Sequence, residues 1–291
     1  AGTGDVSVTA GNDILDARGD TVGVDGEGFA TQTGDSRTEN IIASGAQLDA
    51  GNDIGAPGNP VDTDITTLAA QAGGSLYIYE NSGVAVDHVA FGGVNRVALD
   101  SSVTAGAGAR DQSDLDAGTH AKLETINGTL TVNEGSSNAG DASGGVRAGS
   151  DVLLAANGPA AAASDVDLNA SVTSGRHTTV LARRDVNQNI AGGSQGDIIA
   201  GGADATGTID VEAYEGSVTM ADGTESSTQG GNIRYAAVEK DLADTTQTQD
   251  VILGLLDAGT GDVSVTAGND ILDARGDTVG VDGEGFATQT G

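Results

Sequence analysis

Short runs with apolar residues at alternate positions recur along the whole chain, and Gly, Asp and Asn separate them. Alternation of this kind is typical of a β-strand with one buried face. No window repeats apolar residues at the spacing of a long amphipathic helix, so the pattern predicts an all-β protein. The predicted strands are Asp5–Ala10, Ser75–Tyr79, Val94–Leu99, Thr129–Val132, Asp151–Ala155, Asp165–Leu168, Thr178–Ala182, Ile209–Ala213, Asn232–Val238 and Asp250–Leu255.

The chain begins and ends with the same sequence, because Ala1–Gly34 returns without change as Ala258–Gly291. We interpret residues 1–257 as one repeat unit and residues 258–291 as the start of the next identical unit, homogenised by recent duplication or copied artificially. Neither end carries a distinct capping element. The array is therefore expected to continue beyond both ends, with matching conformations in the two copies and a screw along one axis relating them.

The predicted strands lie roughly 10 to 25 residues apart, which is typical of a solenoid with two or three short strands per coil. At ~20 to 25 residues per coil, a unit would form roughly 10 to 13 coils and a rod of ~50 to 60 Å. Immunoglobulin-like sandwiches would instead show a period near ~100 residues and a core aromatic, commonly Trp. Ten residues are expected to face inward: Val6, Val8, Leu76, Ile78, Leu130, Val132, Val152, Leu154, Ile209 and Val211. Ser7, Tyr77 and Asp210 are among their outward polar neighbours.

The composition and the net charge exclude some classes of binding partner. The chain has no Trp or Cys, only three Phe and four Tyr, and 47 Gly, which are expected to supply turns with positive φ. Its net charge of −31 argues against nucleic acid or an anionic membrane as a partner. A unit without the repeated tail carries −26, or about one charge per 2 Å of such a rod. Rods of that charge should repel one another and bundle when divalent cations are added.

Several segments resemble one known family. Gly4–Ala17, GDVSVTAGNDILDA, is similar to the degenerate coils of filamentous-haemagglutinin-like proteins, giant bacterial surface proteins built from a parallel β-helix. Gly58–Ala70 with Gly74–Val89 resembles their strand pairs, as do Asp151–Gly158 and Gly207–Ala221. The resemblance implies a right-handed parallel β-helix, export, and a role as an adhesin or surface fibre.

One segment suggests a cation site. Gly11–Leu15, GNDIL, resembles the calcium-binding nonapeptide of β-rolls, in which adjacent turns share carboxylates around Ca²⁺. The following residues contain only part of a second copy of this motif, so the alternative is a coil corner with turn-forming Asn and Asp. The candidate ligands for Ca²⁺ or another divalent cation are Asp13, Asp16, Asp20, Asp25 and Glu27. Arg18–Asp20 is also an RGD tripeptide, for which an exposed turn is the simpler interpretation.

No catalytic or cofactor-binding residue is expected. Carboxylates two residues apart could perform acid and base work, but such pairs are expected by chance among 43 acids. The pairs are Asp62 with Asp64, Asp114 with Asp116 and Asp165 with Asp167, and the three histidines, His88, His120 and His177, show no ligand-like spacing.

These observations favour a non-enzymatic segment of a giant extracellular or cell-surface fibre or adhesin. Its expected partners are neighbouring repeats of the same chain, other rods in lateral bundles, and cell-surface glycans, without nucleic acid or membrane insertion. No cofactor is required, and Ca²⁺ or other divalent cations are optional ligands. The alternative is a carbohydrate-binding or polysaccharide-cleaving β-helix, which would need a groove with clustered acids and aromatic platforms.

Overall fold

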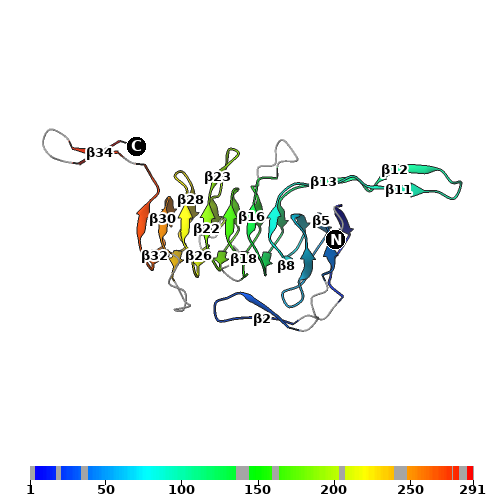
Figure 1. The fold of residues 1–291 in the computed structure, drawn as a ribbon, viewed down its shortest axis with the longest axis horizontal. Coiled ribbons are helices and arrows are strands. Elements are labelled where there is room, and N and C mark those ends of the chain that lie inside the picture. The colour runs from blue at the N-terminus through cyan, green and yellow to red at the C-terminus, as the bar shows by residue number, and fades with distance from the viewer. Residues whose placement is uncertain are drawn as a thin grey trace.

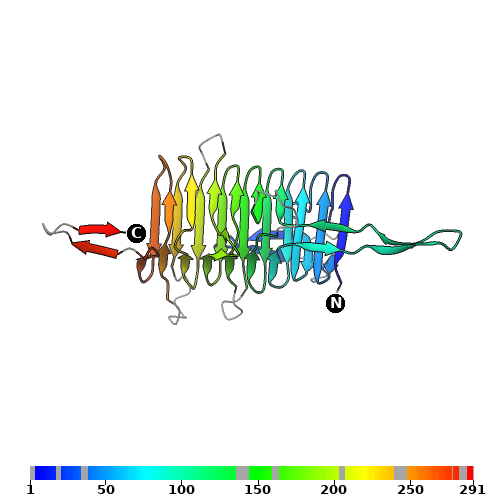
Figure 2. The same ribbon diagram turned by 90° about the horizontal axis from the view of Figure 1, so that it is seen from above.

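The structure, a computed structural model, describes residues 4–17, 21–33, 39–135, 144–158, 164–202, 207–238, 248–276, 278–281 and 287–290. In these residues the chain is all β and contains no helix. Short parallel strands wind coil upon coil around one apolar core and form an elongated rod (Figures 1 and 2). The expected parallel β-helix is confirmed, and its right-handedness stays a prediction.

The coils pass through columns of parallel strands, which we name the first, second and third faces, and the third face begins only in the third coil. The first face contains β1 (Val6–Ala10), β5 (Gly45–Ala50), β7 (Thr67–Ala72), β14 (Leu115–Ala117), β17 (Val146–Ala148), β20 (Val172–Ser174), β25 (Ile198–Ala200), β28 (Glu225–Thr228) and β31 (Leu255–Asp257). The second face contains β4 (Ile41–Ile42), β6 (Val61–Asp64), β8 (Leu76–Glu80), β15 (Ala121–Thr125), β18 (Val152–Ala156), β21 (Thr178–Ala182), β26 (Ile209–Ala213), β29 (Ile233–Ala237) and β32 (Val263–Ala267). The third face contains β9 (Val84–Val86), β16 (Leu130–Val132), β19 (Val166–Leu168), β22 (Val186–Gln188), β27 (Val218–Met220), β30 (Val251–Leu253) and β33 (Ile271–Asp273).

The core consists of inward side chains stacked in columns. All ten residues predicted to face inward belong to or pack against this one apolar cluster. Val6 and Val8 are only partly buried, because β1 pairs with a strand on one side alone. The outward neighbours Ser7 and Asp210 are partly exposed, whereas Tyr77 keeps only 9% of its surface and is covered from outside.

The number of coils is smaller than predicted. The second face has nine strands, one per coil, whereas roughly 10 to 13 coils per unit were expected. Within the regular part, Leu154 pairs with Val180 only 26 residues later, and Val211 pairs with Tyr235 only 24 residues later. Ile78, however, pairs with Leu123, which follows 45 residues later. The difference arises because antiparallel hairpins leave the coils and use residues without adding length.

The hairpins form small two-stranded sheets outside the coils. They are β2 (Thr21–Val24) with β3 (Ala30–Thr33), β10 (Val89–Phe91) with β13 (Arg110–Gln112), β11 (Val94–Val97) with β12 (Val103–Ala107), β23 (Ile190–Ala191) with β24 (Ser194–Gln195), and β34 (Thr278–Val281) with β35 (Ala287–Thr290). We name residues Val89–Gln112 the arm, which extends past the first coil along the rod axis (Figure 1). The strand predicted at Val94–Leu99 therefore exists as β11, but it lies in the exposed arm and not in a coil.

Aspartates stack at the coil corners. Each precedes the first inward residue of a strand, and its carboxylate accepts the backbone N–H at the equivalent position of the next coil. The nitrogen to carboxylate-oxygen distances are 3.1 Å from Asp53 to Asp13, 2.7 Å from Ser75 to Asp53, 3.1 Å from Asp185 to Asp165, 2.8 Å from Ser217 to Asp185, 2.8 Å from Glu225 to Asp197 and 3.0 Å from Asp270 to Asp250. These six of the 43 acidic residues therefore stabilise the backbone, because these N–H groups would otherwise lack a partner.

Glycines stack at the corner between the first and second faces. A Cβ built on Gly73, Gly118 or Gly149 would lie 2.1 to 2.3 Å from the carbonyl oxygen of the equivalent glycine one coil earlier. None of these three glycines has positive φ. The prediction that glycine supplies positive φ holds in turns such as Gly28 (φ +99°). In the glycine column, glycine is required because the backbones of two successive coils approach each other closely.

The two identical copies occupy different faces. Val6–Ala10 pairs with β5 of the first face, whereas Val263–Ala267 pairs with β29 of the second face. Both copies form the same five-residue strand, and both hairpins share one register, with Thr21 opposite Thr33 and Thr278 opposite Thr290. The copies do not match throughout, however, because Ile14 forms only an isolated bridge whereas the equivalent Ile271 begins strand β33. The second copy is also advanced by eight coils and one additional face.

Candidate functional site

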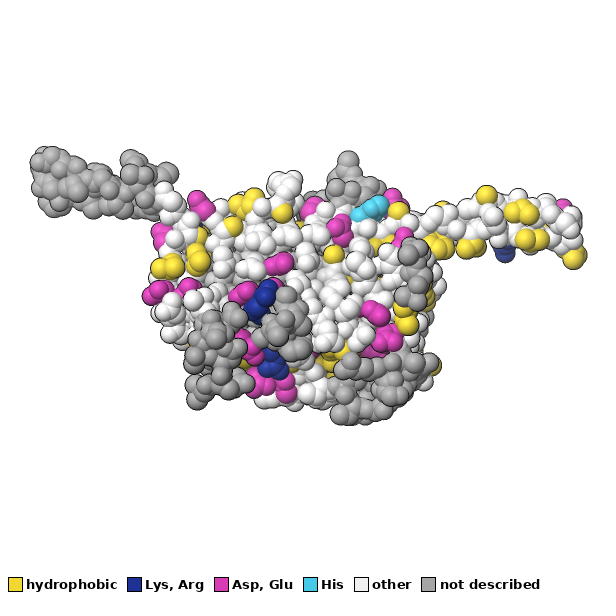
Figure 3. Space-filling model, in the orientation of Figure 1, with side chains coloured by type: hydrophobic (Ala, Val, Ile, Leu, Met, Phe, Trp, Pro, Cys, Tyr) yellow, Lys and Arg dark blue, Asp and Glu magenta, His cyan; other side chains and the backbone are white. Residues whose placement is uncertain are grey.

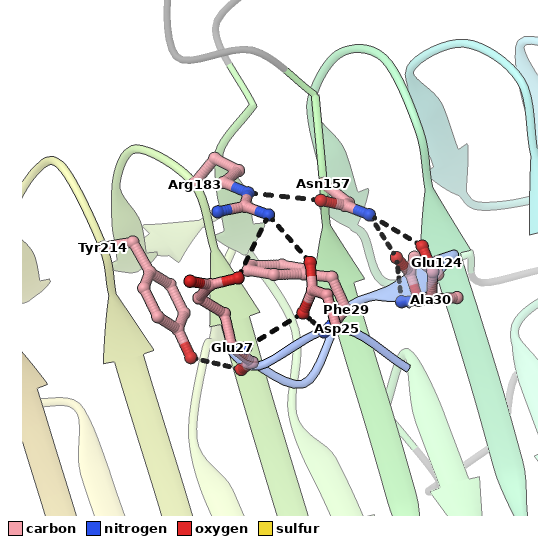
Figure 4. A network of polar contacts seen from close by, with 8 residues as sticks. All are labelled: Asp25, Glu27, Phe29, Ala30, Glu124, Asn157, Arg183 and Tyr214. Carbon is pink, nitrogen blue, oxygen red and sulfur yellow. Dashed lines mark hydrogen bonds and ion pairs between the residues drawn. The ribbon is translucent and has the colours of Figure 1, made fainter. Parts of the chain in front are cut away.

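A hairpin covers part of the second face. We name residues Thr21–Thr33 the strap, because they leave the first coil and lie along the outside of later coils (Figures 1 and 4). Under the strap, Phe29 packs on three residues of the solenoid, namely Ala155, Leu181 and Tyr214, in a second apolar cluster outside the main core. Phe29 is fully buried by this contact.

The strap's own sequence shapes its tip. The Asp25 carboxylate accepts the backbone N–H groups of Glu27 and Phe29 at 3.0 and 2.9 Å, which closes the turn between β2 and β3. Gly28 has a φ of +99°, a conformation that favours glycine. The turn therefore presents the Phe29 ring to the solenoid.

Phe29 lies between an aromatic ring and a guanidinium group. The ring centroids of Phe29 and Tyr214 are 5.2 Å apart at an interplanar angle of 56°, and the Arg183 Cζ lies 4.3 Å from the Phe29 centroid. Tilted aromatic pairs and cations over ring faces are both favourable arrangements. The Tyr214 hydroxyl also donates to the carbonyl oxygen of Glu27.

Three stacked side chains recognise the strap. Asn157, Arg183 and Tyr214 each follow the last residue of their strand, so they occupy one position on three successive coils. Arg183 pairs with the Asp25 carboxylate at 3.1 Å, and Asn157 Nδ2 donates to the carbonyl oxygen of Ala30 at 3.1 Å (Figure 4). Arg183 Nε also donates to Asn157 Oδ1 at 3.2 Å, which links two members of the row. We name these three residues the recognition row.

Glu124 anchors the other end of the strap. Its carboxylate accepts the Ala30 N–H at 2.9 and 3.0 Å and the Asn157 side-chain amide at 2.9 Å. Burial raises the pKa of Glu124 to about 7, although these hydrogen bonds oppose the increase. Asp25 raises this pKa further by repulsion and Arg183 lowers it. Strap contact and the protonation of Glu124 are therefore coupled.

Two hollows adjoin the strap. A cavity of about 140 Å³ lies beneath it, between Val22 and Val24 of the strap and Tyr77 of the solenoid. An open cleft of about 390 Å³ lies beside the tip, and its lining includes Asp151, Asp210 and Glu212. Those acids are ion-paired: Asp151 lies 2.7 Å from Arg176, and Arg234 lies 2.7 Å from Asp210 and 2.9 Å from Glu212. Figure 3 shows Lys and Arg side chains placed among acids on this side of the rod.

The candidate cation ligands are not brought together as one set. Asp13 belongs to the corner ladder, which confirms the corner interpretation of Gly11–Leu15, and the Asp16 carboxylate accepts the side-chain amide of Asn40 at 2.8 Å. Asp25 and Glu27 lie together at the strap tip, facing Arg183. Asp20, like the whole Arg18–Asp20 tripeptide, lies outside the described residues. Among the described residues, no group of three His, Asp or Glu side chains is placed to hold a metal ion. A calcium site here stays a prediction.

The histidines and paired acids are also dispersed. His88, just before the arm, pairs with Asp111 of the arm. His120 Nδ1 lies 3.1 Å from Asp151, and His177 Nδ1 lies 2.9 Å from the Thr208 hydroxyl. Among the acid pairs, Asp165 forms a two-pronged ion pair with Arg184, and Asp167 accepts the side-chain amide of Asn187 at 2.8 Å.

The sequence pattern did not predict the strap, although one strand of the surface that binds it has an unusual pattern. Val152–Ala156 is apolar at every position, which indicates a strand buried on both sides. The structure agrees, since Val152 and Leu154 face the core while Ala155 contacts the strap. Nothing local identifies the strap as the covering element, because Asp25 and Arg183 are 158 residues apart.

No family model, curated protein or solved structure matches the chain. Within the described residues, no helix has the length and apolar character needed to span a membrane.

Proposed function

We propose that this protein is a structural segment of an extracellular or cell-surface fibre, in which identical 257-residue units join into one continuous solenoid. The observation that carries the proposal is the position of β32. This strand belongs to the second copy of the repeat, yet it pairs in register with β29 of the first unit, as Ile233 opposite Val263 and Ala237 opposite Ala267. One unit thus passes into the next by ordinary coil pairing, without a linker.

The geometry of such a fibre follows from the coil count. Each unit advances eight coils and one face, so at about 4.8 Å per coil it adds about 40 Å of length. The additional face turns each unit by about a third of a turn relative to the one before it. Equivalent strands return to the same side after three units, or about 120 Å.

Each unit adds less length than the ~50 to 60 Å expected from the sequence, so its charge per unit length is higher. A unit charge of −26 over about 40 Å is about one charge per 1.5 Å, which exceeds the ~1 per 1.7 Å of duplex DNA. Polyanionic rods of this kind repel one another in low salt and associate when divalent cations neutralise them. We therefore include cation-dependent bundling in the proposed function.

The arm gives a second support. It extends past the first coil in the direction in which a preceding unit would lie, and its exposed apolar residues include Val94, Val97 and Val103, at 59%, 71% and 60% exposure (Figures 1 and 3). An arm of this kind would cross the junction between two units and pack on the earlier one.

The alternative is a carbohydrate-binding or polysaccharide-cleaving β-helix. The cleft beside the strap has the acids that such a site needs, but Arg176 and Arg234 pair with them. Tyr214, its aromatic residue, is packed on Phe29. We therefore propose the fibre. Attachment to a cell surface and binding of glycans belong to the same proposal.

Electron microscopy of chains with one, two and three 257-residue units tests the fibre. We expect straight rods that lengthen by about 40 Å per unit. Compact particles joined by flexible links would refute a continuous solenoid. Labelling of intact source cells with an antibody to the solenoid tests the location, and labelling that appears only after permeabilisation would refute it.

A further inference from the structure

We propose that the strap is a pH-controlled lid, which closes over the second face while Glu124 is protonated and opens once Glu124 is ionised. All of the contacts involved lie within one repeat unit and between described residues, so the lid does not depend on the proposed fibre. Its opening gives the rod a surface that changes with the acidity of the surroundings.

Glu124 belongs to the outside of the solenoid, although it is buried. Its strand neighbour Leu123 points into the main core, and side chains alternate along a strand. On the second face, Glu124 pairs with Tyr79 of the preceding coil and Ala155 of the next coil. Glu124 keeps only 6% of its surface, because the strap lies over it and bonds to its carboxylate through Ala30 (Figure 4). Removal of the strap returns this carboxylate to water.

The charges around Glu124 favour a lid that closes with a proton. The strap contains two carboxylates, Asp25 and Glu27, and no basic residue. Arg183 faces both of them, at 3.1 and 4.0 Å, and its charge also acts on Glu124. Lys122, two residues before Glu124 on the same strand, lines the same cavity beneath the strap. With Glu124 ionised, three carboxylates face two cations, and protonation of Glu124 balances these charges.

The direction of the pH dependence follows from burial. In the closed state, desolvation raises the pKa of Glu124 from 4.5 to about 7, against the hydrogen bonds from Ala30 and Asn157. An open strap leaves this carboxyl hydrated, at its ordinary pKa. Closure is therefore most stable below pH 4.5, and it weakens as the pH rises to 7. Over this range the ratio of open to closed straps can grow by up to about 300-fold.

An open strap uncovers an apolar strip on the second face. Phe29 packs on Ala155, Leu181 and Tyr214, which come from β18, the end of β21 and the residue after β26. Ala155 is fully buried and Leu181 keeps 5% of its surface, although both side chains lie outside the main core. We therefore expect an acidic medium to keep this strip covered and a neutral or alkaline medium to expose it.

The test uses the absence of cysteine from the chain, because a single introduced thiol then reports on one position. Leu181→Cys places the thiol under the strap. Val180→Cys places it in the main core, where Val180 is fully buried. Gly11→Cys places it in the open, where an added Cβ meets nothing within 4 Å. Alkylation rates are measured from pH 5 to pH 8, and each is divided by the rate of Gly11→Cys to remove the pH dependence of the thiol itself.

The relative rate of Leu181→Cys should increase with pH, by up to about 70-fold between pH 5 and pH 8. Val180→Cys should react at least tenfold more slowly than Leu181→Cys at pH 8, because a coil must open to expose it. A relative rate of Leu181→Cys that changes less than about threefold overturns the proposal. Equal rates for Leu181→Cys and Val180→Cys also overturn it, because the strap would then open only together with the coils beneath it.

A second buried carboxyl supplies a matched control. The pKa of Glu80 is also raised to about 7, but Glu80 bonds to Thr63 in the interior and not to the strap. In the Leu181→Cys chain, Glu124→Gln keeps an acceptor for the Ala30 N–H without a charge, so it should remove the pH dependence of labelling. Glu80→Gln should leave that pH dependence in place. Any other pair of results overturns Glu124 as the group that controls the lid.

Circular dichroism at each pH checks that the coils of these variants stay folded. If Leu181→Cys disturbs the coils, Ala155→Cys provides a second thiol under the strap, and it is judged by the same outcomes.

Discussion

The glycine column at the corner between the first and second faces gives the sharpest prediction about stability. A Cβ added at Gly118 would lie 2.1 Å from the carbonyl oxygen of Gly73, a backbone atom that no rotamer change can move. Gly11 occupies the same corner position in the first coil, where an added Cβ meets nothing within 4 Å. The substitutions Gly118→Ala and Gly11→Ala therefore add the same methyl group. In Gly118→Ala it meets the backbone of the preceding coil, and in Gly11→Ala it meets no such backbone.

The magnitude follows from what must move. To bring the contact to an ordinary distance, the two coils must separate locally by about 1 Å. That movement strains the bonds from Gly118 N to Ala72 O and from Thr119 N to Gly74 O, both 2.9 Å long. Two weakened hydrogen bonds cost ~0.5 to 1.5 kcal/mol each, and overpacking adds ~1 to 3 kcal/mol. Reduced freedom of the unfolded chain returns ~0.4 to 1 kcal/mol, so Gly118→Ala should lower the free energy of unfolding by about 2 to 4 kcal/mol.

Equilibrium unfolding in urea, followed by far-ultraviolet circular dichroism, measures the difference between the two variants. Because a solenoid can open in parts, amide hydrogen exchange at Thr119 should be measured as well, and it should accelerate in Gly118→Ala alone. Gly11→Ala should leave stability unchanged or raise it by up to ~1 kcal/mol. Free energies of unfolding that agree within ~0.5 kcal/mol for the two variants would refute steric crowding as the reason for the column.

Three further predictions concern charge. Asp185→Ala should lower the free energy of unfolding by about 1 kcal/mol, because Ser217 N–H loses its acceptor, whereas Asp185→Asn keeps an acceptor and should cost less than half as much in the same urea titration. Burial raises the pKa of both Glu80 and Glu124 from 4.5 to about 7, so the folded protein retains protons that the unfolded chain releases in that range. Their contribution, on the order of 3 kcal/mol each, is complete below pH 4.5 and is lost as the pH rises to 7. The melting temperature should therefore fall between pH 5 and pH 7, and substitution of both residues by Gln should flatten that slope; an unchanged slope would count against it. Light scattering should rise as Ca²⁺ or Mg²⁺ is titrated to tens of millimolar at low salt, and a flat trace would contradict cation-dependent bundling.

The alternation of apolar and polar residues predicted coil strands such as β8, β18, β21 and β26, but it missed β5, β7 and most other strands of the first face. Leu130 with Val132 and Val152 with Leu154 are placed correctly because every strand of a solenoid has one face on the core, whichever coil it belongs to. The same argument cannot distinguish a coil from a hairpin. Val94–Val97 was predicted as a strand and forms one, yet it belongs to the arm, because a strand pattern does not specify the partner of the strand.

The strap could not be predicted for a related reason. Its binding surface depends on side chains that stack only after coiling, so Asn157, Arg183 and Tyr214 form a row through pairing and not through sequence spacing. The corner aspartates show the same limit. The Gly11–Leu15 motif suggested a cation site, but the fold uses Asp13 and the equivalent aspartates as acceptors for the N–H groups of the next coil.

The two copies of Val-Ser-Val-Thr-Ala show what sets the phase of the repeat. Val6–Ala10 lies in the first face and Val263–Ala267 in the second, so the sequence itself is compatible with either face. Both faces require only inward residues at alternate positions. The face is decided instead by the number of coil strands between the copies. Loops and hairpins, including the arm, can therefore change in length without effect on the phase. Loss of a single coil strand between a strap and its recognition row, in contrast, would turn the two apart by one face and separate them.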